Sequence, residues 1–143
     1  MENMSFGEAL SGIMFERNID SKNLAIHLNV TQSTVNNWKS NRTGIELSML
    51  VRLCNYFKCS LDYLVGKSER NIIPTNFTLK NFGLQVRKIM KLRNISSYKL
   101  QKETRFNGKY FNVWDNGSQP KLSTLIELAN YFNCSLDELV GLE

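Results

Sequence analysis

Apolar residues in the first half of the chain recur three and four positions apart, which is the spacing that places side chains on one face of an α-helix. Few stretches alternate with the period of two that a β-strand requires. The apolar positions predict five short helices, built around the following residues: Phe6, Leu10, Ile13 and Met14; Leu24 and Leu28; Val35 and Trp38; Leu47, Leu50, Leu53 and Phe57; and the segment SLDYLVG at 60–66. Asp20 or Ser21, and then Thr31, are suited to cap the second and third of these helices. We therefore expect an all-α fold.

The same pattern occurs a second time. LSMLVRLCNYFKCSLDYLVG (47–66) aligns without gaps with LSTLIELANYFNCSLDELVG (122–141), at an offset of 75 residues. Upstream, the tryptophans Trp38 and Trp114 align at an offset of 76, so the second copy has lost one residue in the loop that follows its tryptophan. We therefore predict a tandem repeat of one five-helix unit.

The repeat divides the chain into two units, at 1–66 and 77–143, joined by a linker at 67–76. The linker is polar and contains Pro74, so no helix should run through it. Units of this size bury a modest share of their surface, and the two copies are therefore expected to pack on each other. Asp62 and Asp137 each follow a Ser-Leu pair, and we interpret them as first-turn acids favoured by a helix dipole rather than as a catalytic pair.

Residues 24–38, LAIHLNVTQSTVNNW, have the spacing of a helix-turn-helix. Ala25 is small where two helices must approach closely, and Asn29 tolerates the left-handed conformation of a tight turn. Val35 and Trp38 should close the core around that turn. If they point inward, the amide- and hydroxyl-rich side of the last helix is turned outward.

On these residues, both copies resemble the lambda-repressor/Cro-like (XRE-type) helix-turn-helix family, over nearly the whole chain except the linker. The resemblance implies two tandem five-helix domains, in each of which the second motif helix enters the major groove of DNA. This sequence departs from the family at the start of the first motif helix. A phosphate-clamping Gln is common there, whereas this chain has Ser21 with Lys22 beside it.

The resemblance also implies which residues of the first copy contact DNA. Gln32 and Ser33 occupy the leading base-reading positions, with Asn36 and Asn37 one turn further along. Amide side chains suit this role because they can pair bidentately with adenine. Contacts to the phosphates, which set register rather than sequence choice, are expected from the following residues: Thr31, Lys22, Lys39, Arg42 and Thr43.

The second copy has diverged within its motif. Gln101 replaces the small alanine, and Arg105 takes the turn position, where a left-handed backbone would cost about 1 kcal/mol. Its outward residues are expected to be Asn107, Lys109, Tyr110 and Asn112. Two interpretations remain open: this copy binds DNA with its own preference, or Tyr110 and Val113 form a contact with another protein.

Charge favours DNA, and composition argues against other site types. The net charge is +5, with residues 1–73 contributing +1 (8 basic, 7 acidic) and residues 74–143 contributing +4 (10 basic, 6 acidic), much of it in QVRKIMKLR at 85–93. The excess of basic residues favours polyanionic partners.

Three cysteines and one histidine, with no CxxC pair, predict neither a metal site nor a disulfide framework. The absence of a long apolar run or signal pattern predicts a cytoplasmic protein without a membrane partner, and no cofactor or small-molecule ligand is expected.

The sequence thus predicts a sequence-specific double-stranded DNA-binding transcriptional regulator, with a repressor of phage or mobile-element type as the leading hypothesis. Family members usually dimerise so that two recognition helices meet successive major grooves about 34 Å apart. Here either two chains pair as a homodimer or the two copies act as an intramolecular pseudo-dimer.

The alternative function is that of an adaptor or antitoxin-like protein, which uses the first copy for DNA and the second for a protein partner. An enzyme is not expected, because no Gly-rich phosphate loop, HExxH or GxSxG motif appears.

Overall fold

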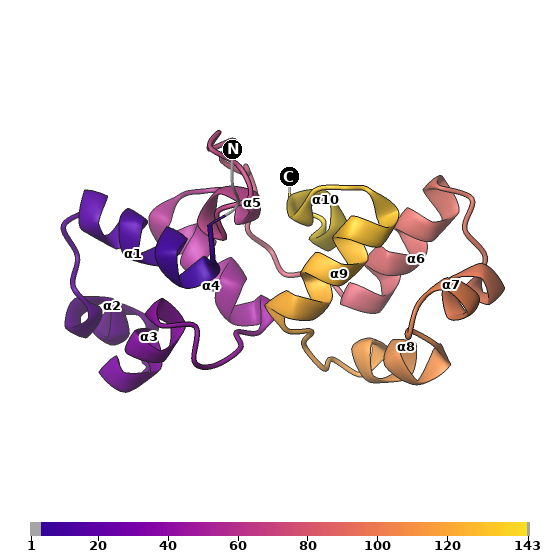
Figure 1. Ribbon diagram of the computed structural model, residues 1–143, viewed down its shortest axis with the longest axis horizontal. Coiled ribbons are helices and arrows are strands. Elements are labelled where there is room, and N and C mark those ends of the chain that lie inside the picture. Colours follow the sequence, from indigo (N-terminus) through magenta and orange to yellow (C-terminus); the bar gives the residue numbers. More distant parts are fainter. Residues whose placement is uncertain (1–3, 143) are drawn as a thin grey trace.

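The computed structural model describes residues 4–142. Over that range the chain forms ten α-helices, five in each half, so the predicted all-α architecture and the two tandem five-helix units are confirmed (Figure 1). The helices have these bounds: α1 Phe6–Glu16, α2 Ser21–Leu28, α3 Gln32–Lys39, α4 Leu47–Phe57, α5 Leu61–Leu64, α6 Phe82–Leu92, α7 Ser97–Glu103, α8 Gly108–Asp115, α9 Leu122–Phe132 and α10 Leu136–Val140. None of the helices in this range is long and apolar enough to cross a membrane.

Helices α2 and α3 begin at cap residues that the sequence indicates. Asp20, not Ser21, caps α2 by accepting a hydrogen bond from the backbone N–H of Asn23 at 2.8 Å, and Thr31 caps α3 through the N–H of Thr34 at 3.1 Å. A side-chain cap of this kind stabilises a helix by about 1 kcal/mol. Asn29 ends α2 with φ 56°, in the left-handed conformation predicted for the turn.

The core of the first copy lies where α1 to α5 meet. Val35 and Trp38 point inward from α3, being 0% and 4% exposed. Ala25 is buried between α2 and its neighbours, as expected for a position where two helices pack closely. Cys54 and Cys59 are fully buried, so both serve as small apolar side chains in this core.

The second copy builds its core around an aromatic cluster. The indole of Trp114 on α8 lies within 6 Å, ring centroid to centroid, of four other rings. They belong to Phe82, Phe106, Tyr110 and Phe111. Such tilted and edge-to-face pairs add about 0.5–1.5 kcal/mol each beyond the apolar area that they bury.

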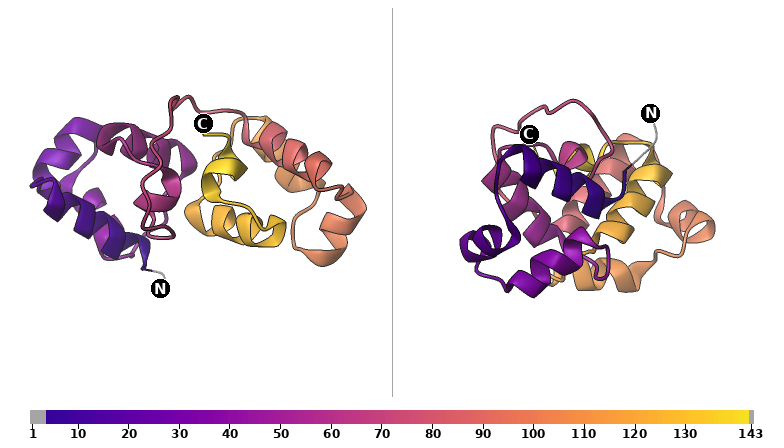
Figure 2. Two further views of the ribbon diagram at one scale, coloured as in Figure 1. Left: turned by 90° about the horizontal axis from the view of Figure 1, so that it is seen from above. Right: turned by 60° about the vertical axis from the view of Figure 1, so that its left-hand side comes forward.

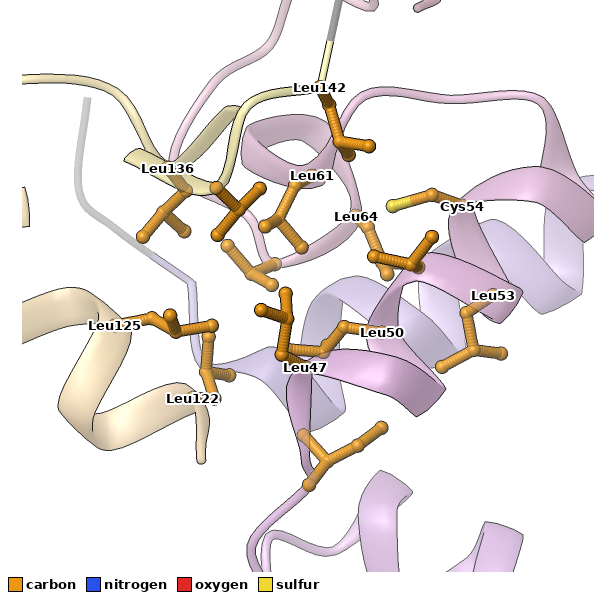
Figure 3. Packing of buried hydrophobic residues seen from close by; sticks show 14 of the residues in the cluster. Leu47, Leu50, Leu53, Cys54, Leu61, Leu64, Leu122, Leu125, Leu136 and Leu142 are labelled. Carbon is orange, nitrogen blue, oxygen red and sulfur yellow. The ribbon is translucent and has the colours of Figure 1, made fainter. Parts of the chain in front are cut away.

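The two copies lie side by side and pack through α4 and α5 of one half against α9 and α10 of the other (Figures 1 and 2). Leucines from both halves meet there in one continuous cluster, with Leu61 and Leu136 both fully buried (Figure 3). Backbone hydrogen bonds also connect the two copies, one in each direction. Leu47 N donates to Pro120 O at 2.9 Å, and Leu122 N donates to Ile45 O at 2.9 Å.

Asp62 and Asp137 each lie in the first turn of their own helix, as predicted, but each carboxylate caps the short helix of the other copy. Asp137 accepts from the N–H groups of Leu61 and Asp62 at 2.8 and 3.0 Å. Asp62 accepts from Leu136 and Asp137 at 3.1 and 3.2 Å. Burial, together with a hydrogen bond to the neighbouring Asp62 carboxyl, raises the pKa of Asp137 to about 7. We call these aspartates, with the two backbone pairs around residues 45–47 and 120–122, the inter-copy junction.

Candidate nucleic-acid interface

Helix α3 presents a polar face to solvent because its apolar face is used by the core. Gln32, Ser33 and Asn36 are exposed, and Asn37 is half-buried at the edge of that face. We call these four residues the amide face. Among the hydrogen bonds that the structure describes, none involves a side chain of these four residues. Their side-chain donors and acceptors therefore point to solvent.

Two of the residues predicted to contact phosphates, Lys39 and Lys22, lie at the N-terminus of α2. Lys39, at the end of α3, donates from Nζ to Oγ of Ser21 at 3.3 Å and so lies over the N-terminus of α2. Ser21 itself is buried, and Lys22 beside it is exposed. Lys22 and the ammonium group of Lys39 therefore both lie at the start of α2. A helix N-terminus with an adjoining cation is a favourable place for a phosphate.

The segment after α3 also has exposed groups that suit a phosphate. Arg42 and Thr43 are both exposed, and neither forms an ion pair within the described residues. Thr31, the remaining predicted phosphate contact, is exposed, but its hydroxyl is engaged as the cap of α3 and lies 2.8 Å from the Thr34 hydroxyl.

Asn41 positions this segment, and the sequence analysis missed it. It adopts a left-handed backbone with φ 58°. Its side chain accepts from Gly7 N at 2.9 Å and donates to the Ser5 hydroxyl at 3.1 Å, which ties the segment before Arg42 to the start of α1. Gly7 is required at this contact, since a Cβ there would collide with the Lys39 carbonyl. An Asn directly after a helix end was the available signal.

The corresponding helix of the second copy presents a different surface. Lys109 and Asn112 are exposed on α8, as predicted. Asn107 is half-buried and its side chain accepts from Lys109 N at 2.9 Å, as the cap of α8. Tyr110 is half-buried: its ring packs on Phe106 and Trp114, and its hydroxyl accepts a hydrogen bond from Arg105.

The prediction of a left-handed Arg105 is wrong. Helix α7 ends one residue earlier than its counterpart, and its cap, Thr104, is extended with φ −136°. The Thr104 hydroxyl donates to Leu100 O at 2.7 Å and accepts from Phe106 N at 3.1 Å, which replaces the left-handed turn. Arg105 does not adopt positive φ, and its guanidinium pairs with Glu127 at 3.1 Å.

The two motifs also differ in how closely their helices pack. Helix α2 packs along α3, whereas α7 does not pack along α8 in the same way. A hollow of about 250 Å³ opens between α6, α7 and α8, lined partly by Leu100, Gln101 and Phe111. Gln101 is exposed, although its counterpart Ala25 is buried. The larger side chain at this position therefore accompanies a wider separation of the two motif helices.

Part of the positive charge of the second copy is neutralised within the fold. Arg87 on α6 forms two hydrogen bonds to the carboxylate of Asp115, at 2.7 and 2.8 Å. Arg93 donates to the Phe132 carbonyl at 2.7 Å and pairs with Glu138 at 3.1 Å. Of the cations in the 85–93 run, Lys88 and Lys91 are exposed with no ion pair in the described structure.

Comparisons with known proteins agree with this arrangement. No curated protein and no solved structure gives a significant match to the chain. A family model, described as the Cro/C1-type helix-turn-helix DNA-binding domain, matches it twice, at residues 9–66 and 85–143. The chain therefore belongs to the Cro/C1-type helix-turn-helix family and carries two of its DNA-binding domains in tandem.

Proposed function

We propose that the protein is a sequence-specific double-stranded DNA-binding regulator, and specifically a repressor of phage or mobile-element type. The observation that carries the proposal is the orientation of α3: Val35 and Trp38 are buried, so the amide face is the side that meets a groove. Repression requires only that the protein cover its site, and a chain built from two DNA-binding domains meets that requirement.

In this proposal the amide face reads base edges. Gln32 and the two asparagines suit adenine, and Ser33 can donate to or accept from several bases. The proposed phosphate contacts come from α2 and from the two ends of α3: Lys22, Thr31, Lys39, Arg42 and Thr43. The protein would reach its operator through the charge attraction of Lys22, Lys39 and Arg42, and select it through the amides.

The test is selection of bound duplexes from a random pool, followed by affinity measurements on the best site. Gln32→Ala should lower the affinity for that site by about 5- to 150-fold and relax the preference at one base position, which is the worth of one bidentate contact. Asn130→Ala, at an exposed amide in the last turn of α9, is the matched control and should change neither. If Gln32→Ala leaves both affinity and preference unchanged, the assignment of base reading to α3 is wrong.

The alternative is an adaptor or antitoxin-like protein whose second copy binds a protein. What favours it is the exposure of two apolar side chains in the diverged motif, Tyr98 at 73% and Val113 at 47%. Tyr110 would contribute less to such a surface, since it is half-buried and its hydroxyl is bonded to Arg105. A stoichiometric partner that co-purifies with the intact chain, and is lost on Val113→Asn while DNA binding through α3 persists, would support this alternative.

A further inference from the structure

The contacts of the inter-copy junction occur in pairs with the roles of the two copies exchanged. Asp137 caps α5 and Asp62 caps α10. Leu47 N bonds to Pro120 O, and Leu122 N bonds to Ile45 O. Exchange of roles is the signature of an isologous, two-fold interface. The two copies are therefore related by an approximate two-fold axis within one chain.

The junction occupies the surface that would otherwise be free to pair with a second chain in this way. The N–H groups at the start of α5 and α10 are satisfied by the opposite copy. Leu61 and Leu136 are fully buried between the halves (Figure 3). A second chain could use the same contacts only by displacing the first chain's own second half.

The junction also places the two recognition helices on one side of the molecule. Figure 1 shows α3 and α8 along the same lower edge, one in each half, and the rotated view on the right of Figure 2 shows the same edge. Duplex DNA has local two-fold axes perpendicular to its own axis, and two-fold-related recognition helices match them. One chain therefore has the two-fold arrangement that family members usually reach by dimerising.

The two recognition helices differ in the residues that they present. Three of the four positions in the amide face carry different residues in the second copy: at the offset of 76, Gln32 aligns with Gly108, Ser33 with Lys109 and Asn37 with Val113. Only Asn36 is matched by an identical residue, Asn112. Lysine prefers the O6 and N7 acceptors of guanine, whereas Gln and Asn prefer adenine. Unlike side chains at equivalent positions select unlike bases.

We propose that a single chain binds an asymmetric operator, which consists of two different half-sites in inverted orientation at one fixed spacing. This inference rests on the proposed function, since it presumes that the chain reads duplex DNA. The half-site under α3 is read by amides and contains adenine, and the half-site under α8 contains a guanine opposite Lys109. Asn112 and Asn36 read the same base in both half-sites.

Selection from a random duplex pool with the intact chain tests the arrangement. The expected product has two unlike half-sites, always in the same order, with centres about 10–10.5 base pairs apart. Native mass spectrometry should find one chain per duplex. Scrambling the second half-site should lower the affinity of the intact chain by at least about tenfold.

A conversion variant tests the role of α8 directly. Gly108→Gln, Lys109→Ser and Val113→Asn together transfer the α3 residues onto α8. All three positions are exposed, and a Cβ at Gly108 meets no atom within 4 Å, so the fold should tolerate the changes. Selection with this variant should return a palindrome made of two α3-type half-sites. The matched control, Lys99→Ser and Lys102→Ser on the exposed side of α7, should keep the asymmetric site.

Every result that differs from these expectations overturns one specific part of the proposal. A palindromic site bound by two intact wild-type chains, or a site with only one half, overturns the asymmetric operator while leaving DNA recognition by α3 intact. A second half-site that the conversion variant leaves unchanged overturns its assignment to α8. Failure of the intact chain to enrich any duplex overturns the proposed function itself.

Discussion

The two helix-turn-helix motifs share a fold but are held together by different local chemistry. In the first, the buried Ala25 lets α2 lie against α3, and Asn29 makes the turn through a left-handed backbone. In the second, Thr104 makes the turn through its hydroxyl, and the helices are splayed around a hollow. The turn chemistry of this motif can therefore be exchanged while the tryptophan on the second helix remains buried.

The largest expected difference between the motifs lies at their tryptophans. Replacing a buried Trp by Ala typically costs about 3–5 kcal/mol. Trp114→Ala should lie at the upper end of that range, because the indole contacts four rings in a motif whose two helices make little contact with each other. Trp38→Ala should cost less. Urea unfolding of both variants measures the two costs, and a larger loss for Trp38→Ala would contradict the comparison.

The turn residues should respond in opposite ways to replacement. Asn29→Ala should lower the free energy of unfolding by about 1 kcal/mol, because alanine is strained in the left-handed conformation, whereas Asn29→Gly should cost little. Arg105→Gly should not stabilise the protein, since Arg105 has no positive φ to relieve and would lose its Glu127 pair. Stabilisation by Arg105→Gly would show that the second turn is strained after all.

The junction between the copies should weaken as the pH rises. The pKa of Asp137 lies at about 7 in the folded chain, above its ordinary value of 3.8, so the folded state holds this proton more tightly than the unfolded state. The corresponding stability is present below about pH 4 and is lost as the pH rises through about 7. Unfolding curves between pH 5 and 8 should therefore show a smaller decline for Asp137→Asn than for the wild type. Equal declines would exclude this carboxyl as the source.

The smallest expected effects concern the salt dependence of DNA binding, which should differ between a cation without an ion pair and a cation that is already paired. Arg42→Ala should weaken binding to all duplexes similarly and reduce the slope of log affinity against log salt by about 0.9, because one phosphate contact is lost. Arg87→Ala should change that slope less, since Arg87 is already paired with Asp115. Fluorescence anisotropy at several salt concentrations measures both slopes. An effect of Arg42→Ala confined to one base position would show that Arg42 contacts a base.

Local features of the sequence predicted the first copy well. Cap residues such as Asp20 and Thr31 act on N–H groups only three residues away, and Val35 and Trp38 share a face by helical spacing alone. Exposure of the amide face follows from the same spacing, whereas its contacts with DNA remain a prediction.

Features that depend on distant residues were not predictable in the same way. The aspartate in each SLD segment marks a helix start, but nothing in the pattern says that Asp62 caps a helix 74 residues away. Thr104 was also missed, because the left-handed turn was assumed from alignment with Asn29. A hydroxyl that bonds to the carbonyl four residues back offers the chain another solution.

The inter-copy junction has a consequence for how occupancy responds to protein level. When two separate subunits must meet before they bind, occupancy at low expression rises with the square of the concentration. Here the partner domain is supplied at a fixed effective concentration by the same polypeptide. Under the single-chain proposal, occupancy of the operator would rise in direct proportion to the number of molecules, with no assembly threshold even at a few copies per cell.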